Sequence, residues 1–431
     1  MRSRPVTVAL LGPFGGGNLG DAAIQDAVLA HLGARRPDVR MIGISMVPAD
    51  TMERHGIETY AYNTHAFQFN RRKARREPAR ESPTFARRIR ESLRWRLSPL
   101  LRAAYGLAHA LYVFAKLTKI DLLLVSGGGQ IDEFWGGPWE HPFTLFKWVT
   151  LARLTGTRVA FLSVGAGSVS SSVSRWFLRR ALRQAHYRSF RDAGSKQIVG
   201  ARLGCGADDP VVPDMAFALP VAPLVNSAGD PKKRVLVAIG PMPYGHPEIW
   251  PARDSGAYER YIALLAEFSR KLMQEGITPE FFPGQISSDP AAIQDICDRL
   301  DARPTRPSIR TVGELISFLS TADIVVASRF HGALLALLLR RPVIALSYER
   351  KVRQLMADCG QADLCLDLEH ASFDQLLRTY ASAMSRRHAI SAVLDARVRR
   401  DTSAVLAQFD LVASSLLPKP RLVGRKAEDL V

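Results

Sequence analysis

The sequence of 431 residues has few cysteines and no long hydrophobic run. Its four cysteines show no C-x-x-C pair and no zinc-ligand spacing, which predicts free thiols in a reducing compartment. The longest uncharged apolar run, Ala103–Ala115, has 13 residues, whereas about 20 are needed to span a bilayer. The apolar run Val6–Leu11 ends in glycines rather than in a signal-peptide cleavage site, so a first β-strand is expected there. We therefore expect a soluble, cytoplasmic protein.

Acidic residues are outnumbered, with 41 Asp and Glu against 58 Lys and Arg. The segment 71–102 alone holds twelve basic and three acidic residues. Within it, Phe85, Ile89, Leu93 and Leu97 recur every four residues, which predicts one apolar face of a basic helix. Such a helix suits peripheral contact with an anionic membrane, and a solvated insertion is the alternative. No nucleic-acid-binding motif accompanies the charge, so no nucleic-acid partner is expected.

Short apolar runs alternate with helical segments along the chain, which predicts an α/β protein with parallel sheets. Predicted strands in the first half are Val6–Leu11, Val39–Ser45, Asp121–Ser126, Arg158–Val164 and Tyr187–Arg191. Predicted strands in the second half are Arg234–Ile239, Pro279–Phe282, Asp323–Ala327 and Pro342–Ser347. We expect an N-terminal domain at 1–222 with an Arg-rich insertion at about 66–118, a linker at 223–233, a C-terminal domain at 234–416 and a flexible tail at 417–431. Two Rossmann-like domains would then face a cleft lined by the carboxyl ends of their strands.

The first strand is followed by a glycine-rich turn at 15–20 that matches G-x-G-x-x-G and opens a helix. Glycines such as Gly17 and Gly20 let a backbone approach a ligand, and helix amides can face an anion. A dinucleotide site would need an acidic residue at the end of the second strand, and Ile44–Val47 supplies none. Asn18 and Asp21 flank the turn, and each is expected either to cap the helix or to contact substrate.

Two further strand ends carry candidate ligands for an anion. Gly127, Gly128 and Gly129 follow the third predicted strand, where their free amides could form an anion nest or admit a sugar ring. Arg191 ends the fifth strand and could clamp a carboxylate or phosphate, or else pair with Asp192 at the surface. Asp214 interrupts an apolar run and is expected to be either a cap or a site residue.

The most specific pattern places Arg329 and His331 two residues apart, directly after a strand and at the start of an apolar helix. The helix dipole favours a bound anion at that position. Tyr348 and Lys351 follow the next strand and supply a phenol and a further cation near the same rim. Together these residues predict a cleft for a small dianionic or trianionic substrate and a hydroxyl acceptor, with no metal site.

Four stretches in order resemble the motifs of the polysaccharide pyruvyl transferase family, over residues 12 to about 357. They are Gly17-Asn18-Leu19-Gly20-Asp21, Gly127-Gly128-Gly129, Ser189-Phe190-Arg191-Asp192, and Ser328-Arg329-Phe330-His331 followed by Pro342, Tyr348 and Lys351. The resemblance implies a glycosyltransferase-B-like fold. It also implies transfer of pyruvate from phosphoenolpyruvate to sugar hydroxyls as a ketal, in exopolysaccharide or cell-surface glycan synthesis.

The same resemblance implies that Arg191 and Arg329 hold the carboxylate and phosphate of phosphoenolpyruvate, and that His331 transfers a proton. Phosphoenolpyruvate would be a co-substrate, and no separate cofactor is expected. The Arg-rich insertion is not part of the family pattern. It leaves open a free saccharide acceptor or a lipid-linked one, met at the inner face of the plasma membrane.

Two other functions compete with this interpretation. A nucleotide-sugar glycosyltransferase of the same architecture would need an acidic residue for the ribose, and Glu349 or Asp358 could serve. A non-catalytic glycan-assembly scaffold could bind membrane through the Arg-rich helix and keep a degenerate cleft. The intact pair of Arg329 and His331 argues against a degenerate cleft.

Overall fold

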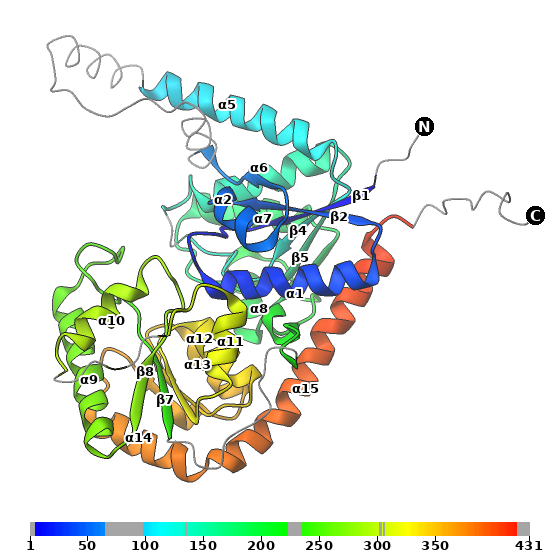
Figure 1. The fold of residues 1–431 in the computed structure, drawn as a ribbon. Coiled ribbons are helices and arrows are strands. Elements are labelled where there is room, and N and C mark those ends of the chain that lie inside the picture. The colour runs from blue at the N-terminus through cyan, green and yellow to red at the C-terminus, as the bar shows by residue number, and fades with distance from the viewer. Residues whose placement is uncertain are drawn as a thin grey trace, which may run out of the picture.

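The computed structural model describes residues 5–64, 98–133, 136–222, 235–300, 304 and 307–419, which form two parallel sheets flanked by helices (Figure 1). The first sheet has the strand order β3-β2-β1-β4-β5-β6. Its strands are β1 (Val6–Leu11), β2 (Val39–Ser45), β3 (Thr59–Ala61), β4 (Leu122–Ser126), β5 (Arg158–Val164) and β6 (Tyr187–Phe190). The helices of this half are α1 (Leu19–Arg35), α2 (Pro48–His55), α5 (Ser98–Leu117), α6 (His141–Leu154), α7 (Ser172–Arg183), α8 (Ala193–Leu203) and the 3₁₀ turn η1 (Met215–Ala218).

The second sheet has the order β11-β10-β9-β7-β8 and is again parallel throughout. Its strands are β7 (Leu236–Gly240), β8 (Thr278–Phe281), β9 (Ile324–Ala327), β10 (Val343–Ser347) and β11 (Cys365–Asp367). The helices are α9 (Ser255–Gln274), α10 (Asp289–Cys297), α11 (Val312–Leu319), α12 (Phe330–Leu338), α13 (Arg350–Asp358), η3 (Ala362–Leu364), α14 (Phe373–Ser385), α15 (Arg387–Leu411) and a terminal turn η4 (Val412–Leu416).

Alternate residues of the central strands of the first sheet enter different cores. Leu10 and Leu124 face a core shared with α1, η1 and the whole second half, whereas Leu11 and Leu123 face a core closed by α5, α6 and α7. This alternation follows from the two-residue period of a β-strand. One continuous apolar core therefore joins the two halves on the α1 side of the first sheet.

The C-terminal helix α15 starts beside the second sheet and runs back along the first half (Figure 1). Gln408 on this helix bonds Ser163 and Ser189 in the first sheet, with Nε2 donating to Ser163 Oγ at 3.0 Å. Thr402 Oγ1 donates to the carbonyl of Phe217 in η1 at 2.7 Å. The C-terminal segment is thus part of both halves of the molecule.

Several sequence predictions fall on residues that the structure does not describe. The apolar stripe Phe85, Ile89, Leu93 and Leu97 lies outside the described residues, as do the predicted linker 223–233 and all but the first three residues of the predicted tail. The carboxyl-terminal part of the predicted insertion forms α5. In the described residues, no helix combines the length and the apolar character needed to cross a membrane.

Candidate active site

The candidate site lies where the amino ends of α1 and α12 meet, at the carboxyl ends of β1 and β9. Gly20 is the second residue of α1, and His331 is the second residue of α12. A Cβ atom added to Gly20 would come within 2.1 Å of His331 Nδ1. The imidazole therefore packs directly on the backbone of α1, and only glycine leaves room for it.

His331 and Asp214 face each other across the joint between the two halves. His331 Nε2 lies 3.7 Å from Asp214 Oδ2, and both atoms are buried without a hydrogen-bond partner among the described residues. Burial alone would raise the pKa of Asp214, but the His331 imidazole and the Arg191 guanidinium hold that pKa below its usual range. The other Asp214 oxygen accepts the amide of Ala216 at 3.1 Å and caps η1. Asp214, which the sequence left open between two roles, is both a cap and a member of the site.

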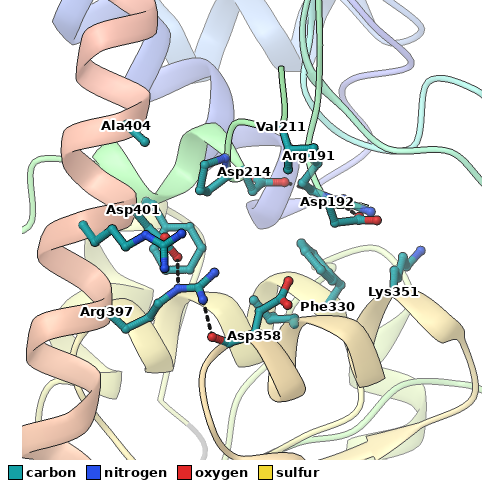
Figure 2. A pocket seen from close by; sticks show the side chains of 14 residues that line it. Arg191, Asp192, Val211, Asp214, Phe330, Lys351, Asp358, Arg397, Asp401 and Ala404 are labelled. Carbon is teal, nitrogen blue, oxygen red and sulfur yellow. Dashed lines mark hydrogen bonds and ion pairs between the residues drawn. The ribbon is translucent and has the colours of Figure 1, made fainter. Parts of the chain in front are cut away.

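Arg191 is buried and lies beside the same carboxylate, as Figure 2 shows. Its Nη1 lies 3.5 Å from Asp214 Oδ2, and its Nε lies 3.5 Å from Asp192 Oδ2. The guanidinium stacks on the ring of Phe330 at 4.2 Å. A Cβ atom at Gly165 would come within 2.6 Å of Arg191 Nη2, so that glycine gives the guanidinium its space. Arg191 does contact Asp192, but in the cleft and not at the surface.

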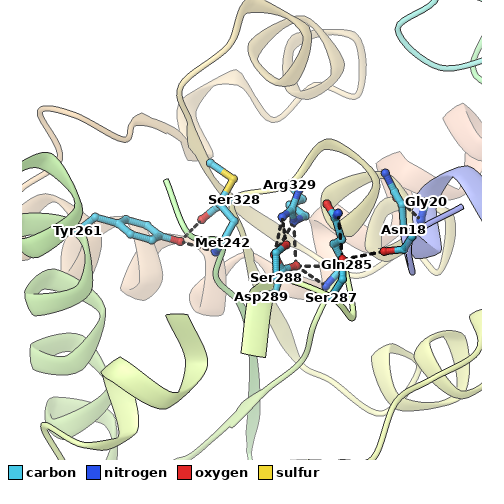
Figure 3. A network of polar contacts seen from close by, with 12 residues as sticks. Asn18, Gly20, Met242, Tyr261, Gln285, Ser287, Ser288, Asp289, Ser328 and Arg329 are labelled. Atoms are coloured by element: carbon cyan, nitrogen blue, oxygen red, sulfur yellow. Dashed lines mark hydrogen bonds and ion pairs between the residues drawn. The ribbon is translucent and has the colours of Figure 1, made fainter. Parts of the chain in front are cut away.

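Arg329 makes a much tighter contact with Asp289, which is buried at the start of α10 (Figure 3). Arg329 Nε donates to the two Asp289 oxygens at 2.9 and 2.8 Å, and Nη2 bonds Asp289 Oδ1 and Ser288 Oγ. Asp289 Oδ2 also accepts the amides of Gly284 and Gln285 at 2.8 and 2.7 Å. Arg329 Nη1 makes no hydrogen bond with a described residue and remains as a donor toward a ligand.

The glycine-rich turn at 15–20 joins the two halves. Asn18 Oδ1 accepts the amides of Gly20 and Asp21 at 3.0 and 3.2 Å, so these two amides are not open to an anion. The amide of Leu19 donates to the carbonyl of Gly284 at 3.0 Å, and the amide of Ile286 donates to that of Gly17 at 2.9 Å. The turn was expected to present helix amides to a ligand, and the structure instead uses it as an interdomain contact.

Asp21 follows the turn and lies among the charged groups of the site. Burial raises its pKa, and the charges of His331, Asp214, Lys351 and Arg329 all act on it. The predicted nest at Gly127–Gly129 adjoins it, since a Cβ atom at Gly128 would lie 3.8 Å from Asp21 Oδ1. Gly127 and Gly128 have φ of 56° and 66°, which favour glycine. Gly128 of the predicted nest and Asp21 therefore lie side by side.

Lys351 and Tyr348 line a more open part of the rim. Lys351 Nζ pairs with Glu349 Oε2 at 2.6 Å. Burial would raise the pKa of Glu349, and the Lys351 ammonium holds it below its usual range. Tyr348 packs against Tyr244 and Trp250, with ring centroids 5.1 and 5.6 Å apart. Glu349 and Asp358, the candidate ribose ligands, both have partners, since Asp358 Oδ1 accepts Gln354 Nε2 at 2.9 Å.

A cavity of about 220 Å³ opens between Arg191, Asp214 and Phe330 on one side and α15 on the other (Figure 2). From α15, Arg397 and Asp401 line it and pair with each other at 2.6 Å. In the part of the chain that the structure describes, no group of three or more His, Cys, Asp or Glu side chains could hold a metal ion.

The model of the family described as polysaccharide pyruvyl transferase matches residues 18–350. The chain belongs to this family. The match runs from the Asn18 cap to Arg350, and it contains Asp21, Arg191, Asp214, Arg329 and His331.

Similar solved structures share the fold at low sequence identity. A putative UDP-N-acetylglucosamine 2-epimerase from Listeria monocytogenes superposes with a TM-score of 0.58 and 11% identity, over 96% of each chain. The Neisseria meningitidis UDP-GlcNAc 2-epimerase bound to UDP-GlcNAc gives 0.55 and 11%, over 94% of this chain and 99% of that one. A trehalose-phosphate synthase from Burkholderia vietnamiensis gives 0.53 and 13%, over 96% and 97%. The family member described here therefore has the glycosyltransferase-B-like fold that the sequence predicted.

The polar residues of the site that were not identified from the sequence include Asp289, Arg397 and Asp401. Asp289 precedes a proline at the start of a helix, where an acidic residue is normally interpreted as a helix cap. Arg397 and Asp401 lie on α15, far from the motifs in sequence. The cap pattern was a signal for Asp289, and the sequence holds no signal for the other two.

Proposed function

We propose that this family member transfers the pyruvyl group of phosphoenolpyruvate to two hydroxyls of a saccharide and forms a cyclic ketal. A proton adds to the methylene carbon of the enol while one sugar hydroxyl attacks the adjacent carbon. The second hydroxyl then attacks the same carbon, and the bond to the phosphate oxygen breaks. Of the two hydroxyl protons, one balances the new methyl group and the other leaves with phosphate, so the step needs no redox partner.

The pair of His331 and Asp214 carries the proposal. Two buried polar atoms that face each other at 3.7 Å, neither with a hydrogen-bond partner among the described residues, are unusual in a folded protein. Contacts between catalytic groups are often long before substrate binds. We infer that Asp214, which faces Nε2, orients the His331 ring, and that His331 transfers the proton to the enol carbon. A positioned acid or base of this kind contributes about 10²–10⁴-fold to rate.

Arg191 is the main proposed ligand for the anionic donor. Its contacts with Asp192 and Asp214 are 3.5 Å long, and the ring of Phe330 supports it from one side. A phosphate or carboxylate can therefore bind it bidentately and more closely than its present partners do. Arg329 would add Nη1 while Asp289 fixes its position. Both cations would stabilise charge on the departing phosphate.

The aromatic group of Tyr244, Trp250 and Tyr348 is the proposed platform for the saccharide. These three rings pack on one another, and Tyr348 follows β10, the neighbour of the strand β9 that precedes Arg329. Aromatic surfaces commonly line ligand pockets, with a few polar groups fixing orientation, and a pyranose ring has an apolar face that can pack there. The acceptor we propose is a precursor of an exopolysaccharide or cell-surface glycan, modified in the cytoplasm.

Donor binding can be tested by thermal unfolding with phosphoenolpyruvate and, in parallel, with UDP-N-acetylglucosamine. Phosphoenolpyruvate at about 100 times Kd should stabilise the protein by roughly 2.7 kcal/mol. Arg191→Ala should remove that shift. Arg378→Ala, a change of an exposed arginine on α14, should keep it. A shift with the nucleotide sugar and none with phosphoenolpyruvate would overturn the proposal in favour of a glycosyltransferase.

The role of His331 can be tested by phosphate release from phosphoenolpyruvate with a panel of aryl hexosides, and by NMR of the new ketal methyl group. His331→Asn should lower kcat by about 10²–10⁴-fold and leave phosphoenolpyruvate affinity nearly unchanged. The matched control is His370→Asn, since the His370 side chain is 81% exposed. Equal losses of affinity and folding stability, with kcat per folded molecule unchanged, would make His331 a structural residue.

A further inference from the structure

Helices α5, α6 and α7 form one layer on the outer face of the first sheet, where α6 packs against both of the others (Figure 1). None of the three helices contains an Asp or Glu residue. Helices α9, α14 and α15, on the other half, each contain acidic residues. We call the outward surface of α5, α6 and α7 the α5–α7 face.

Large apolar side chains project from the α5–α7 face into solvent. On α5, Leu107 and Leu111 are 63% and 62% exposed, and Phe114 lies one turn further along. Trp139, just before α6, and Trp176, on α7, are 66% and 50% exposed. These indoles are held in place, since Trp139 packs on Phe177 at 5.4 Å and Trp176 packs on Phe146 at 5.3 Å. An apolar area of this kind on a protein surface indicates an interaction site.

The arginines in the second half of α7 have no ion-pair partner among the described residues. On α7, the exposed arginines are Arg179, Arg180 and Arg183, and none of them forms an ion pair with a described residue. Arg180 lies 5.7 Å from the ring of Trp176. The α5–α7 face therefore combines exposed apolar side chains, tryptophans and arginines that form no ion pair with a described residue.

We propose that the α5–α7 face binds peripherally to an anionic lipid bilayer. Tryptophan favours the boundary between headgroups and acyl chains. Amphipathic surfaces that carry arginine beside apolar residues bind anionic lipids through burial and electrostatic attraction. A second copy of this chain is a poorer partner, because two identical faces without acidic residues would repel each other. No helix of the described residues spans the bilayer, so the contact is with its surface.

The test is flotation of the full-length protein with vesicles of phosphatidylcholine alone, or of phosphatidylcholine and phosphatidylglycerol in equal amounts. The protein should bind the anionic vesicles at low salt. It should be released at about 1 M salt, where the Debye length is about 3 Å. Each cation near an anionic surface contributes about a fivefold factor in affinity. Arg179→Glu, Arg180→Glu and Arg183→Glu together should therefore weaken binding by at least about 100-fold.

Matched variants on the other half of the molecule provide the control. Arg378→Glu, Arg386→Glu and Arg399→Glu change the same net charge on exposed positions of α14, of its C-terminal cap and of α15, and they should weaken binding by less than about tenfold. Leu107→Ser with Leu111→Ser should weaken binding to anionic vesicles, and Val393→Ser, at an exposed site on α15, should not.

Three results would overturn the proposal. The first is no binding to anionic vesicles at low salt. The second is an equal loss of binding in the two sets of arginine variants, which would mean attraction by net charge alone. The third is dimerisation in sedimentation experiments that the Leu107 and Leu111 changes abolish while vesicle binding stays intact. Thermal unfolding of each variant checks that these surface changes leave the fold unaffected.

Discussion

The two acidic residues that face the joint between the halves differ in how fully they are bonded. Asp289 accepts hydrogen bonds from Arg329 and from the amides of Gly284 and Gln285. Asp214 keeps one buried oxygen that faces His331 Nε2 at 3.7 Å without a hydrogen bond. A buried polar network that is fully satisfied makes a structure rigid, whereas an unsatisfied one stores free energy that a ligand can release. One carboxylate therefore fixes the joint, and the other keeps an oxygen that can accept a further hydrogen bond.

The same division separates two residues at the start of α12. Arg329, the cap of the helix, is bound to Asp289, the fully hydrogen-bonded carboxylate. His331, two residues later, faces Asp214, and its buried Nε2 has no hydrogen-bond partner among the described residues. The two residues of one sequence motif therefore have different partners, because positions two residues apart at the start of a helix point in different directions.

Removal of the Asp289 carboxylate should have the largest effect on stability. Asp289→Ala leaves the Arg329 charge without its buried partner, and breaking a buried ion pair in this way costs about 3–5 kcal/mol. Asp214→Ala should cost less, about 1–3 kcal/mol, because it removes one cap and a carboxylate that is only partly bonded. Urea unfolding of the two variants measures the difference. Equal losses would contradict the division between the two carboxylates.

Gly20→Ala should separate packing at His331 from helix propensity. The added Cβ atom would meet the imidazole at 2.1 Å, so we expect the ring to be displaced and transfer activity to fall by at least about 10-fold. Gly33 lies in the same helix with no atom within 4 Å of an added Cβ. Gly33→Ala should therefore stabilise the protein by about 0.4–1 kcal/mol without loss of activity. If Gly20→Ala and Gly33→Ala have the same effect on transfer activity, the close contact between Gly20 and His331 is not needed for activity.

The smallest expected effects concern pH, and they have opposite signs for two carboxyl groups of the site. Burial raises the pKa of Asp21, so its ionised form costs stability above that raised pKa, and the cost vanishes as pH falls below the ordinary value of 3.8. Asp214 is also buried, but His331 and Arg191 hold its pKa below the ordinary value of 3.8. The ionised Asp214 therefore stabilises the fold above pH 3.8, and this stabilisation is lost only as the pH falls through the lowered pKa.

Asp21→Asn should therefore raise the unfolding temperature at pH 7, with a gain that shrinks toward pH 4. Asp214→Asn should lower the unfolding temperature at pH 7, with a deficit that persists down to about pH 4. Unfolding curves of both variants across this range measure the two trends. A deficit for Asp214→Asn that disappears well above pH 5 would show that the carboxylate has no favourable partner.

Much of the fold was accessible from the sequence because buried parallel strands are short apolar runs. The predicted strand Val6–Leu11 coincides with β1, and the apolar helix that was expected to start at Arg329 and His331 is α12. The edge strands β3 and β11 were not predicted, since each has three residues and is too short to show a pattern.

The candidate site was accessible where a motif follows a strand, as for Arg191 and His331. It could not be predicted where the role of a residue depends on contacts with distant parts of the chain. The turn at Gly17 and Asn18 reads as an anion-binding loop until Gly284 and Ile286 occupy its backbone groups. Arg397 reaches the cavity only because α15 crosses from one half to the other.

The crossing of α15 has a consequence for how the protein is made. The ribosome completes the first sheet by residue 190, but the helix that pairs with Ser163 and Ser189 starts at Arg387. Domains generally begin to fold during synthesis, in order from the N-terminus. The nascent first half must therefore wait, with these buried hydroxyls and the carbonyl of Phe217 still unpaired by α15, until almost the whole chain has emerged. A stalled or truncated product would expose these unpaired polar groups and the surface that α15 covers. We therefore expect chaperones and proteases to recognise it.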